Sequence, residues 1–422
     1  MSIILHRKFV CADAENNNNK FWEVILDDAN QATIKFGRVG ATASIKTKIM
    51  TLAQVEKEIK EKTKPGRKNG SYTEIEIVAE SISKPSSTNV INTAVRDIAG
   101  QNNILIDLVS LLAEANRHEL NIASGGQMQI NTSGLVTTPL GVIKQENIDE
   151  ARTILSNMEQ DILNKNFDSS TFIANLNQYL RLVPQKVSAS RGWHKTFIPN
   201  IDAMQRQNTL LDQLESSVKM ATSQINSEIV IDERVFEVTL ELIDNNTQEF
   251  KDIQEFYKTG HQTRHSAVSH LKPKRAFRVV IPHMKQAYDA CKIGNEKRLW
   301  HGTRVFNVLS ILKNGLIIPK GGSYHITGRM FGDGVYFSDQ STKSLNYATN
   351  FWSGGKNDSL TFMFLCDVKM GKEYIPTGPF SGNAPAGFDS TYAIGGKSQV
   401  LNNEMIVYSL DQCNITHLVE FE

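Results

Sequence analysis

The segment "GRMFGDGVYFSDQSTKSLNYA" (residues 328–348) decides how the C-terminal half of this chain folds. Its centre, "GVYFSD", alternates apolar and polar residues and predicts a short strand that carries Tyr336. Two other segments place a polar residue next to apolar strand residues. In "LWHGT" (residues 299–303), His301 follows the apolar pair Leu299 and Trp300, and in "NNEMIVY" (residues 402–408), Glu404 precedes the run "MIVY". Short strands separated by Gly- and Asn-containing loops, with a few helices between them, predict an antiparallel α+β domain over residues 226–422.

The rest of the chain predicts two further domains, so the expected fold class is multidomain α+β. The alternation in "FWEVILDD" and "TEIEIVAE" predicts a small β-rich domain over residues 1–85, which a Ser/Pro-rich linker, "SISKPSSTN", ends. Over residues 86–225 the apolar period becomes helical, with Ile148, Ala151 and Leu155 on one face. We predict an all-α domain there, whose apolar stripes form a core rather than a cofactor site.

Composition excludes several classes of protein. The 422 residues carry a formal net charge of +1, which is too small for a chain-wide polyanion-binding field. The four cysteines are scattered without a CxxC pair, so we expect a reducing compartment and no metal site. No apolar run approaches the roughly eighteen residues of a membrane span, so no membrane association is expected. Neither a GxGxxG turn nor a Walker lysine loop is present.

Each of the three strand-edge residues, taken alone, has an ordinary explanation. His301 is typical of a structural histidine, Tyr336 of a half-buried packing residue, and Glu404 of a solvated carboxylate at a strand start. Together, their order, spacing and local sequence resemble the poly(ADP-ribose) polymerase family of ADP-ribosyltransferases, whose signature is a histidine, a tyrosine and a glutamate on three strands. The resemblance implies an enzyme that uses NAD+ as its substrate and needs no metal.

The resemblance also implies which residues hold the nicotinamide end of NAD+. The Gly302 backbone and the Ser344 hydroxyl would bond the carboxamide, and a residue without Cβ lets backbone approach a ligand closely. Tyr336 and Tyr347 would enclose the nicotinamide ring between their aromatic faces.

The remaining implied roles concern the ribose groups and the chemistry. His301 would hold the adenosine-side ribose hydroxyls, with Thr303 and Asn307 nearby. Glu404 would accept a hydrogen bond from the nicotinamide-ribose 2′-hydroxyl, because cleavage of the glycosidic bond develops positive charge on that ribose. Lys343 would assist through its charge rather than by proton transfer.

Two positions depart from the family pattern near the adenine and nicotinamide. Arg329 stands where family members often have a tyrosine, and Ile317 stands where an arginine is common. Neither belongs to the histidine–tyrosine–glutamate set. By the same resemblance, a glutamate at position 404 favours elongation of a polymer over single additions.

The N-terminal and central regions resemble two regulatory domains of the family. "TTPLGVIKQENIDEARTIL" resembles its helical regulatory domain, an autoinhibitory lid that opens on activation. "FWEVILDDANQATIKFGRVG" resembles the WGR domain, although the motif here reads Phe36-Gly37-Arg38. By resemblance, Phe36 would stack on an end nucleotide of a DNA strand break while Arg38 meets the DNA backbone, since stacking needs only an aromatic face.

The sequence therefore predicts a DNA-dependent poly(ADP-ribose) polymerase that modifies protein acceptors, itself included, in the DNA-damage response. We expect a monomer when no DNA is bound, located in the nucleus of a eukaryote or in the cytoplasm and nucleoid of a bacterium. Two alternatives remain. One is a mono-ADP-ribosyltransferase with the same site; the other is a DNA-binding scaffold with a vestigial transferase domain.

Overall fold

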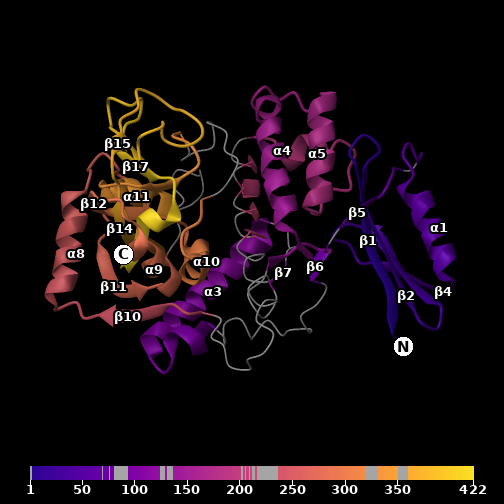
Figure 1. Cartoon of the computed structure of the whole chain (residues 1–422), viewed down its shortest axis with the longest axis horizontal. Helices are drawn as coiled ribbons and strands as arrows, with labels where there is room; N and C mark the ends of the chain where they lie inside the picture. The colour runs from indigo at the N-terminus through magenta and orange to yellow at the C-terminus, as the bar shows by residue number, and fades with distance from the viewer. Residues whose placement is uncertain are drawn as a thin grey trace. The chain divides into compact units, whose positions relative to one another are not determined.

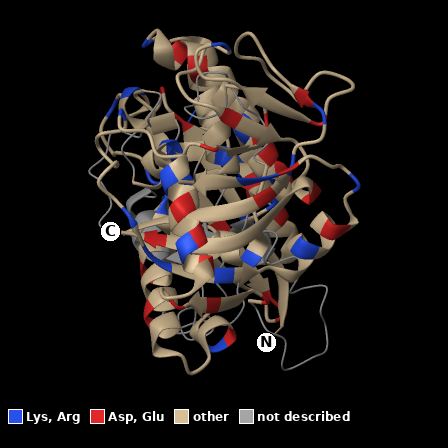
Figure 2. Ribbon diagram, turned by 90° about the vertical axis from the view of Figure 1, so that its left-hand side faces the viewer, with Lys and Arg blue, Asp and Glu red and all other residues tan. Residues whose placement is uncertain are grey.

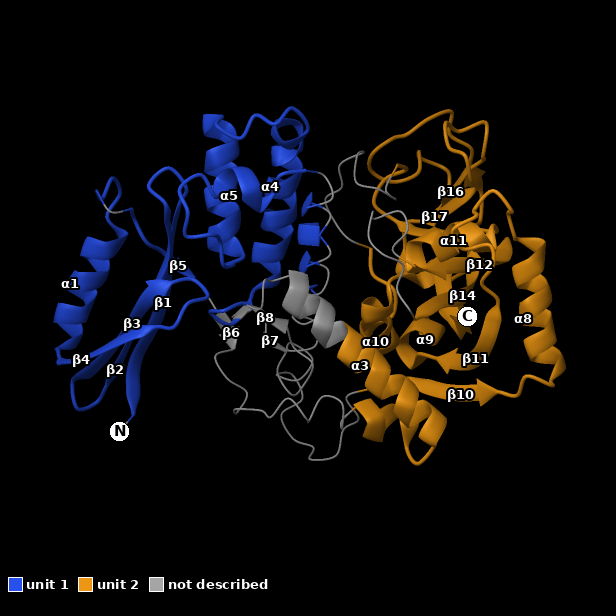
Figure 3. Ribbon diagram, turned by 180° about the vertical axis from the view of Figure 1, so that it is seen from behind, with its two compact units in different colours: residues 1–86, 120–228 blue, residues 87–119, 229–422 orange. Residues whose placement is uncertain are grey.

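The computed structural model describes residues 2–68, 70–75, 77–79, 94–123, 129–130, 136–200, 203–204, 206–208, 210–211, 214–215, 236–318, 330–349 and 360–422. The expected linker at residues 81–89 and Arg329 lie outside the described residues. The chain forms two compact units, residues 1–86 with 120–228 and residues 87–119 with 229–422 (Figures 1 and 3).

The first unit contains an antiparallel five-stranded sheet in the order β4-β3-β2-β1-β5. Its strands are β1 (Ile3–Asp13), β2 (Asn18–Asp27), β3 (Gln31–Arg38), β4 (Ser44–Ile49) and β5 (Thr73–Ile75). Helix α1 (Leu52–Thr63) begins with a capping box at Thr51 and buries Val55 and Ile59 against the Trp22 side of the sheet. The alternation of apolar residues in the strands thus produces the expected half-buried sheet.

Helices of the central region complete the first unit. They are α4 (Gln145–Leu163), α5 (Ser170–Leu182) and α6 (His194–Phe197), with the short strands β6 (Ile77–Ala79), β7 (Gln129–Ile130), β8 (Val136–Thr137) and β9 (Val142–Ile143). The apolar stripe of α4, including Ile148, Ala151 and Leu155, is fully buried. Helix α5 lies beside β1, where the Ala14 N–H donates to Asn177 Oδ1 at 2.9 Å.

The second unit is built on two sheets. The larger, β10-β11-β18-β14-β12, is antiparallel throughout, and the smaller has the order β13-β17-β16-β15. Its strands are β10 (Thr239–Ile243), β11 (Pro273–Val280), β12 (Glu296–Gly302), β13 (Val335–Phe337), β14 (Thr361–Lys369), β15 (Glu373–Tyr374), β16 (Ser390–Ala393), β17 (Glu404–Val407) and β18 (Cys413–Phe421). The pairing of β15 with β16 is parallel, because residues 375–389 are long enough to return the chain in the same direction.

Helical segments surround these sheets. They are the π-helix η1 (Val95–Ala99), α3 (Asn103–Ala123), α8 (Gln248–Thr259), α9 (Pro282–Ala290), α10 (Val305–Asn314), α11 (Ser341–Ala348) and the 3-10 helix η3 (Leu410–Gln412). Leu105, Leu108 and Leu112 of α3 belong to the same buried cluster as Phe277 of β11 and Leu309 of α10. Because α3 uses its apolar face in this way, a separate all-α domain is not confirmed, although the mixed α+β class is.

The surface of the second unit carries both signs of charge. On the side turned to the viewer in Figure 2, Lys and Arg lie among Asp and Glu along the strands. Arg278 pairs with Glu249 at 2.6 Å and Arg298 with Asp367 at 3.1 Å. Among the described residues, no helix has both the length and the apolar character that a bilayer crossing requires.

Candidate active site

The three strand-edge residues meet where the two sheets of the second unit join. Strand β12 ends at His301 and Gly302. Trp300, one residue earlier, exchanges backbone hydrogen bonds of 2.9 and 3.0 Å with Ser338, just after β13. Strand β13 carries Tyr336 and pairs with β17, which begins at Glu404. This isolated bridge and the pairing of β13 with β17 together bring three segments that are distant in sequence to the same place.

His301 is held in one tautomer by a backbone carbonyl. Its Nδ1 lies 2.9 Å from the Tyr336 carbonyl oxygen, which can only accept, so Nδ1 carries the proton. Burial lowers the pKa of His301, so the ring is neutral near pH 7. The other ring nitrogen, Nε2, is consequently an acceptor and can receive a hydrogen bond from a ligand hydroxyl.

Gly302 is a glycine because helix α11 passes directly against it. A Cβ at position 302 would lie 1.8 Å from the Ser344 carbonyl oxygen and 2.7 Å from the Ser344 carbonyl carbon. Real Cβ atoms do not approach backbone this closely, so any side chain would displace α11. From the sequence, we expected the Gly302 backbone to lie close to a ligand. The structure shows that it also lies close to α11, the helix that carries Lys343, Ser344 and Tyr347.

The Ser344 hydroxyl is partly used within the protein. It donates to the Trp300 carbonyl oxygen at 3.1 Å, and the side chain is buried. A hydroxyl has one proton and two lone pairs, so Ser344 Oγ can still accept a hydrogen bond from an amide N–H₂. This matches the donor side of a carboxamide.

Tyr336 and Tyr347 have different surroundings in the site. The Tyr336 hydroxyl donates to the Gly332 carbonyl oxygen at 2.8 Å and accepts from the Phe331 N–H at 2.9 Å, which fixes the ring. Tyr347 lies on α11 with Lys343 Nζ 5.4 Å from its ring centre. Burial, and secondarily the Glu404 carboxylate, raises the pKa of Tyr347, so this hydroxyl stays protonated.

Glu404 and Lys343 form a buried ion pair at the centre of the site. Lys343 Nζ lies 3.2 Å from Glu404 Oε1, and the two residues are only 3% and 7% exposed. Glu404 Oε2 has no hydrogen-bond partner among the described residues, although it is buried. An unsatisfied buried carboxylate oxygen is costly, so it needs a donor such as a water molecule or a ligand hydroxyl. The donor it lacks fits a ribose hydroxyl.

Thr303 and Asn307 lie together at the start of α10. Asn307 Nδ2 donates to Thr303 Oγ1 at 3.2 Å, and Thr303 is buried. Ile317 follows the end of α10 and is half-buried. The structure thus brings Thr303 and Asn307 close to the His301–Gly302 strand end.

Sequence reasoning missed the polar residues that fix the approach to Glu404. Asn403 Nδ2 lies 3.1 and 3.2 Å from the two carboxylate oxygens of Asp339, and the Asn403 carbonyl accepts from Ser338 Oγ at 2.8 Å. These residues stand inside the segments "GVYFSD" and "NNEMIVY", but nothing in either segment indicates that they meet. Only the pairing of β13 with β17 brings them together.

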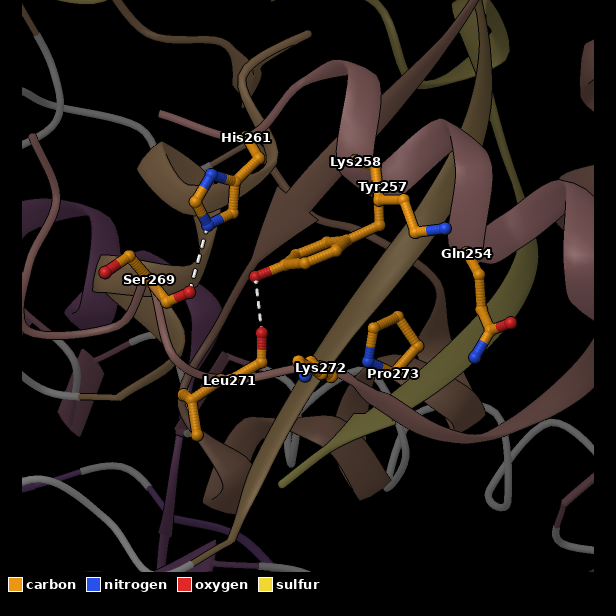
Figure 4. A pocket seen from close by; sticks show the side chains of 8 residues that line it. All are labelled: Gln254, Tyr257, Lys258, His261, Ser269, Leu271, Lys272 and Pro273. Atoms are coloured by element: carbon orange, nitrogen blue, oxygen red, sulfur yellow. Dashed lines mark hydrogen bonds between the residues drawn. The ribbon is translucent and has the colours of Figure 1, made fainter. Parts of the chain in front are cut away.

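The N-terminus of α11 is hydrogen-bonded to the last turn of α8 and to Gly260, the first residue after it. Ser341 Oγ donates to the Tyr257 carbonyl at 2.7 Å, and the Ser341 N–H donates to the Gly260 carbonyl at 3.0 Å. A pocket of about 410 Å³ lies beside this junction (Figure 4). Its lining includes Lys258 and Pro273.

In the first unit, the WGR-like residues lie on β3. Phe36 is half-buried and has Lys46 Nζ 5.4 Å from its ring centre. A Cβ at Gly37 would make only ordinary contacts, the nearest at 3.5 Å, so packing does not require glycine there. Arg38 donates to the carbonyl oxygens of Asn17 at 3.0 Å and Ser188 at 3.1 Å. Arg38 therefore links the sheet to the segment after α5.

Acidification should destabilise the second unit. Burial lowers the pKa values of His265, His301 and His417 below the ordinary 6.5. Between those lowered values and 6.5 the unfolded chain binds more protons, so stability rises with pH in that window and is lost as pH falls through it. The thermal unfolding midpoint should drop between about pH 7.5 and about pH 5.5. His417→Gln should make the drop shallower; a midpoint independent of pH would contradict the prediction.

Two family models match the sequence. The poly(ADP-ribose) polymerase catalytic domain matches residues 247–399, and the WGR domain matches residues 6–76. Among the described residues, no group of three His, Cys, Asp or Glu side chains is placed to hold a metal ion. His301 and Tyr336 lie inside the first match and Phe36 inside the second, whereas Glu404 lies just beyond residue 399.

Several characterised proteins are similar to the chain. It is 27% identical to the protein mono-ADP-ribosyltransferase PARP3 of Mus musculus, an alignment that covers 93% of this chain and 78% of that protein. The same protein of Homo sapiens is 26% identical over 90% of this chain and 75% of its own length. Poly(ADP-ribose) polymerase 1 of Gallus gallus is 25% identical, covering 67% of this chain and 31% of that protein.

Proposed function

Because this chain belongs to the poly(ADP-ribose) polymerase family and is an NAD+ ADP-ribosyltransferase, we propose that it modifies protein side chains, its own included, in response to DNA strand breaks. The observation that carries the proposal is the buried Lys343–Glu404 pair, in which one carboxylate oxygen has no partner within the part of the chain that the structure describes. It stands beside the His301–Gly302 strand end and the tyrosines that the family's chemistry requires.

The reaction breaks one bond of NAD+ and forms one in its place. The bond between the ribose anomeric carbon and nicotinamide breaks, nicotinamide leaves as a neutral base, and an acceptor atom bonds to the same carbon as it loses a proton. Positive charge develops on the ribose, so a carboxylate that is already in position stabilises the transition state more than the bound substrate. Glu404 Oε2 would accept from the ribose 2′-hydroxyl, while the ion pair of Glu404 Oε1 with Lys343 would hold the carboxylate in position.

The other residues would bind and orient NAD+. His301 Nε2 would accept from an adenosine-side ribose hydroxyl, beside Thr303 and Asn307. The Gly302 backbone and Ser344 Oγ would hold the carboxamide. Tyr336 and Tyr347 would enclose the ring through their faces, because the hydroxyl of Tyr336 is already committed to the 331–332 turn. Holding the reacting atoms in place contributes much of the rate.

Polymer synthesis is our first proposal for the product, on the strength of the glutamate at position 404. Single addition is the second, because the mouse and human proteins that align over most of this chain are named mono-ADP-ribosyltransferases. The length of the product separates the two. With labelled NAD+, a ladder of long products supports a polymerase and a single mass increment on the acceptor supports mono-transfer.

The activity should be tested with and without defined DNA ends. We expect nicked or blunt-ended DNA to raise nicotinamide release by the purified chain, and the chain itself to become labelled. Without DNA the chain should be a monomer. If the chain releases no nicotinamide either with or without DNA, the proposal is wrong. The chain is then better described as a DNA-binding scaffold with a vestigial transferase domain. We expect the protein to be located where DNA is, in the nucleus of a eukaryote or in the nucleoid of a bacterium.

Arg38→Ala should weaken stimulation by DNA while the DNA-free rate is retained. The guanidinium would lose its contact with the DNA backbone, and also the hydrogen bonds to Asn17 and Ser188. Arg7, which pairs with Glu74 on the same sheet, offers a matched control as Arg7→Ala. DNA affinity, measured by fluorescence anisotropy, should fall for Arg38→Ala alone. Equal stimulation of the Arg38 variant and the wild type would remove Arg38 from the DNA contact.

A further inference from the structure

The loop between α8 and β11, residues 260–272, contacts the short segment that leads into Glu404. Arg264 Nη2 lies 3.0 Å from the Leu401 carbonyl oxygen and 2.6 Å from Asn402 Oδ1. His265 Nε2 lies 3.1 Å from the same Asn402 oxygen. The side chains of Arg264 and His265 thus both contact the short segment that precedes the proposed catalytic carboxylate of Glu404.

The same loop also contacts the residues that precede Lys343. Arg264 Nη2 lies 3.2 Å from Gln340 Oε1, and His265 Nδ1 lies 2.8 Å from Thr342 Oγ1. The Gln262 N–H donates to Thr342 Oγ1 at 3.0 Å. Arg264 therefore links the segment that precedes Lys343 on α11 to the segment that precedes Glu404 on β17.

The loop is itself well anchored, so it can serve as a fixed support. Figure 4 shows the Tyr257 hydroxyl directed at the Leu271 carbonyl and the His261 ring directed at the Ser269 carbonyl, with distances of 2.9 and 3.0 Å. A Cβ at Gly260 would lie 2.3 Å from the Asp339 carbonyl oxygen, so the loop begins in direct contact with the backbone before α11.

The supported segment, by contrast, has little apolar packing of its own. Leu401 is 83% exposed, and Asn402 is half-buried. Burial of a leucine would ordinarily stabilise a turn, but this leucine faces water. Polar contacts therefore determine where residues 401–403 lie, and through them where β17 and the Glu404 carboxylate begin.

We propose that Arg264 is a positioning residue that fixes the Glu404 carboxylate relative to Lys343, by holding Leu401 and Asn402 on one side and Gln340 on the other. This rests on the proposed function, in which Glu404 stabilises the charge that develops during the reaction. Arg264 touches neither member of the pair and acts only through the segments that carry them. A carboxylate displaced by a fraction of an ångström still allows NAD+ to bind, yet it stabilises the transition state less well.

The test is steady-state kinetics of nicotinamide release by the full chain. Arg264→Ala should lower kcat about tenfold and leave the KM for NAD+ within about twofold, since Glu404 acts on charge that appears only as the bond breaks. Arg264→Lys should recover much of the loss, because all three contacts come from one nitrogen and an ammonium group has three donors. Arg278→Ala removes an exposed arginine of the same unit that pairs with Glu241 and Glu249, and should leave kcat unchanged.

A double-mutant cycle separates positioning from a general loss of stability. If Arg264 acts through Asn402, Arg264→Ala should cost less in kcat when Asn402→Ala is already present. Thermal unfolding of each variant monitors folding, and Arg264 is exposed enough that its truncation should leave the fold intact. An unchanged kcat for Arg264→Ala, or an equal loss for Arg278→Ala, would overturn the inference. An inactive wild type would instead overturn the proposed function, so the two failures are distinguishable.

Discussion

Glu404→Gln should lower the turnover number for nicotinamide release by about 10³-fold while NAD+ still binds. The substitution keeps the shape of the side chain and an oxygen that can face Lys343 Nζ, which lies 3.2 Å from Glu404 Oε1. It removes the negative charge that would stabilise the ribose as nicotinamide leaves. Binding of intact NAD+ depends on contacts elsewhere in the site, so the KM should change much less than kcat.

A second Lys–Glu pair of the same unit provides the matched control. Glu373 pairs with Lys297 at the start of β15, and Glu373→Gln removes the same charge from a pair outside the site. That variant should retain its turnover number. Loss of a buried charge partner can also reduce stability, so thermal unfolding should be measured for both variants. A folded Glu404→Gln enzyme with wild-type turnover would show that Glu404 does not carry the chemistry.

Gly302→Ala should impair both folding and catalysis. The new Cβ would lie 1.8 Å from the Ser344 carbonyl oxygen, a backbone atom that cannot turn aside, so α11 must shift. We expect a loss of about 1–3 kcal/mol of unfolding free energy, the usual range for an overpacked core. Lys343, Ser344 and Tyr347 would shift with the helix, and misplacement by about 1 Å commonly costs about 10²-fold in rate.

Gly294→Ala is the control for this substitution. A Cβ at Gly294 meets none of the described residues within 4 Å, and Gly294 lies just before β12, the strand that ends at Gly302. Its thermal unfolding midpoint and nicotinamide release should match the wild type. The contact of Gly302 with α11 would be refuted by a Gly302→Ala enzyme that unfolds at the wild-type temperature and turns over NAD+ at the wild-type rate.

Local patterns in the sequence were sufficient to predict the strands of the site and the order of their residues. The apolar residues of "LWHGT", "GVYFSD" and "NNEMIVY" indicate short strands, and the structure has β12, β13 and β17 at these places. The reason is that a strand's alternation and a helix's period are properties of a few consecutive residues. The assignment of His301, Tyr336 and Glu404 to one site came from the family resemblance, and their functional roles remain predictions.

The association of helix α3 could not be predicted in the same way. Its apolar stripe indicates that one face is buried but not against what. Leu105 and Leu112 pack with the core of the second unit, whereas α4 and α5 lie in the first. The three predicted domains were divided in the order of the chain. The packing of apolar helix faces does not follow that order, because α3 and the helices after it pack in different units.

The sequence alone therefore determined the strands and helices around the site and, through the family resemblance, the type of chemistry expected there. Only the tertiary structure decided which residues support that site. Arg264 lies 138 positions from Asn402, and a hydrogen bond joins the two residues. Nothing local marks such partners, because their meeting depends on how whole sheets and helices pack rather than on the residues beside them.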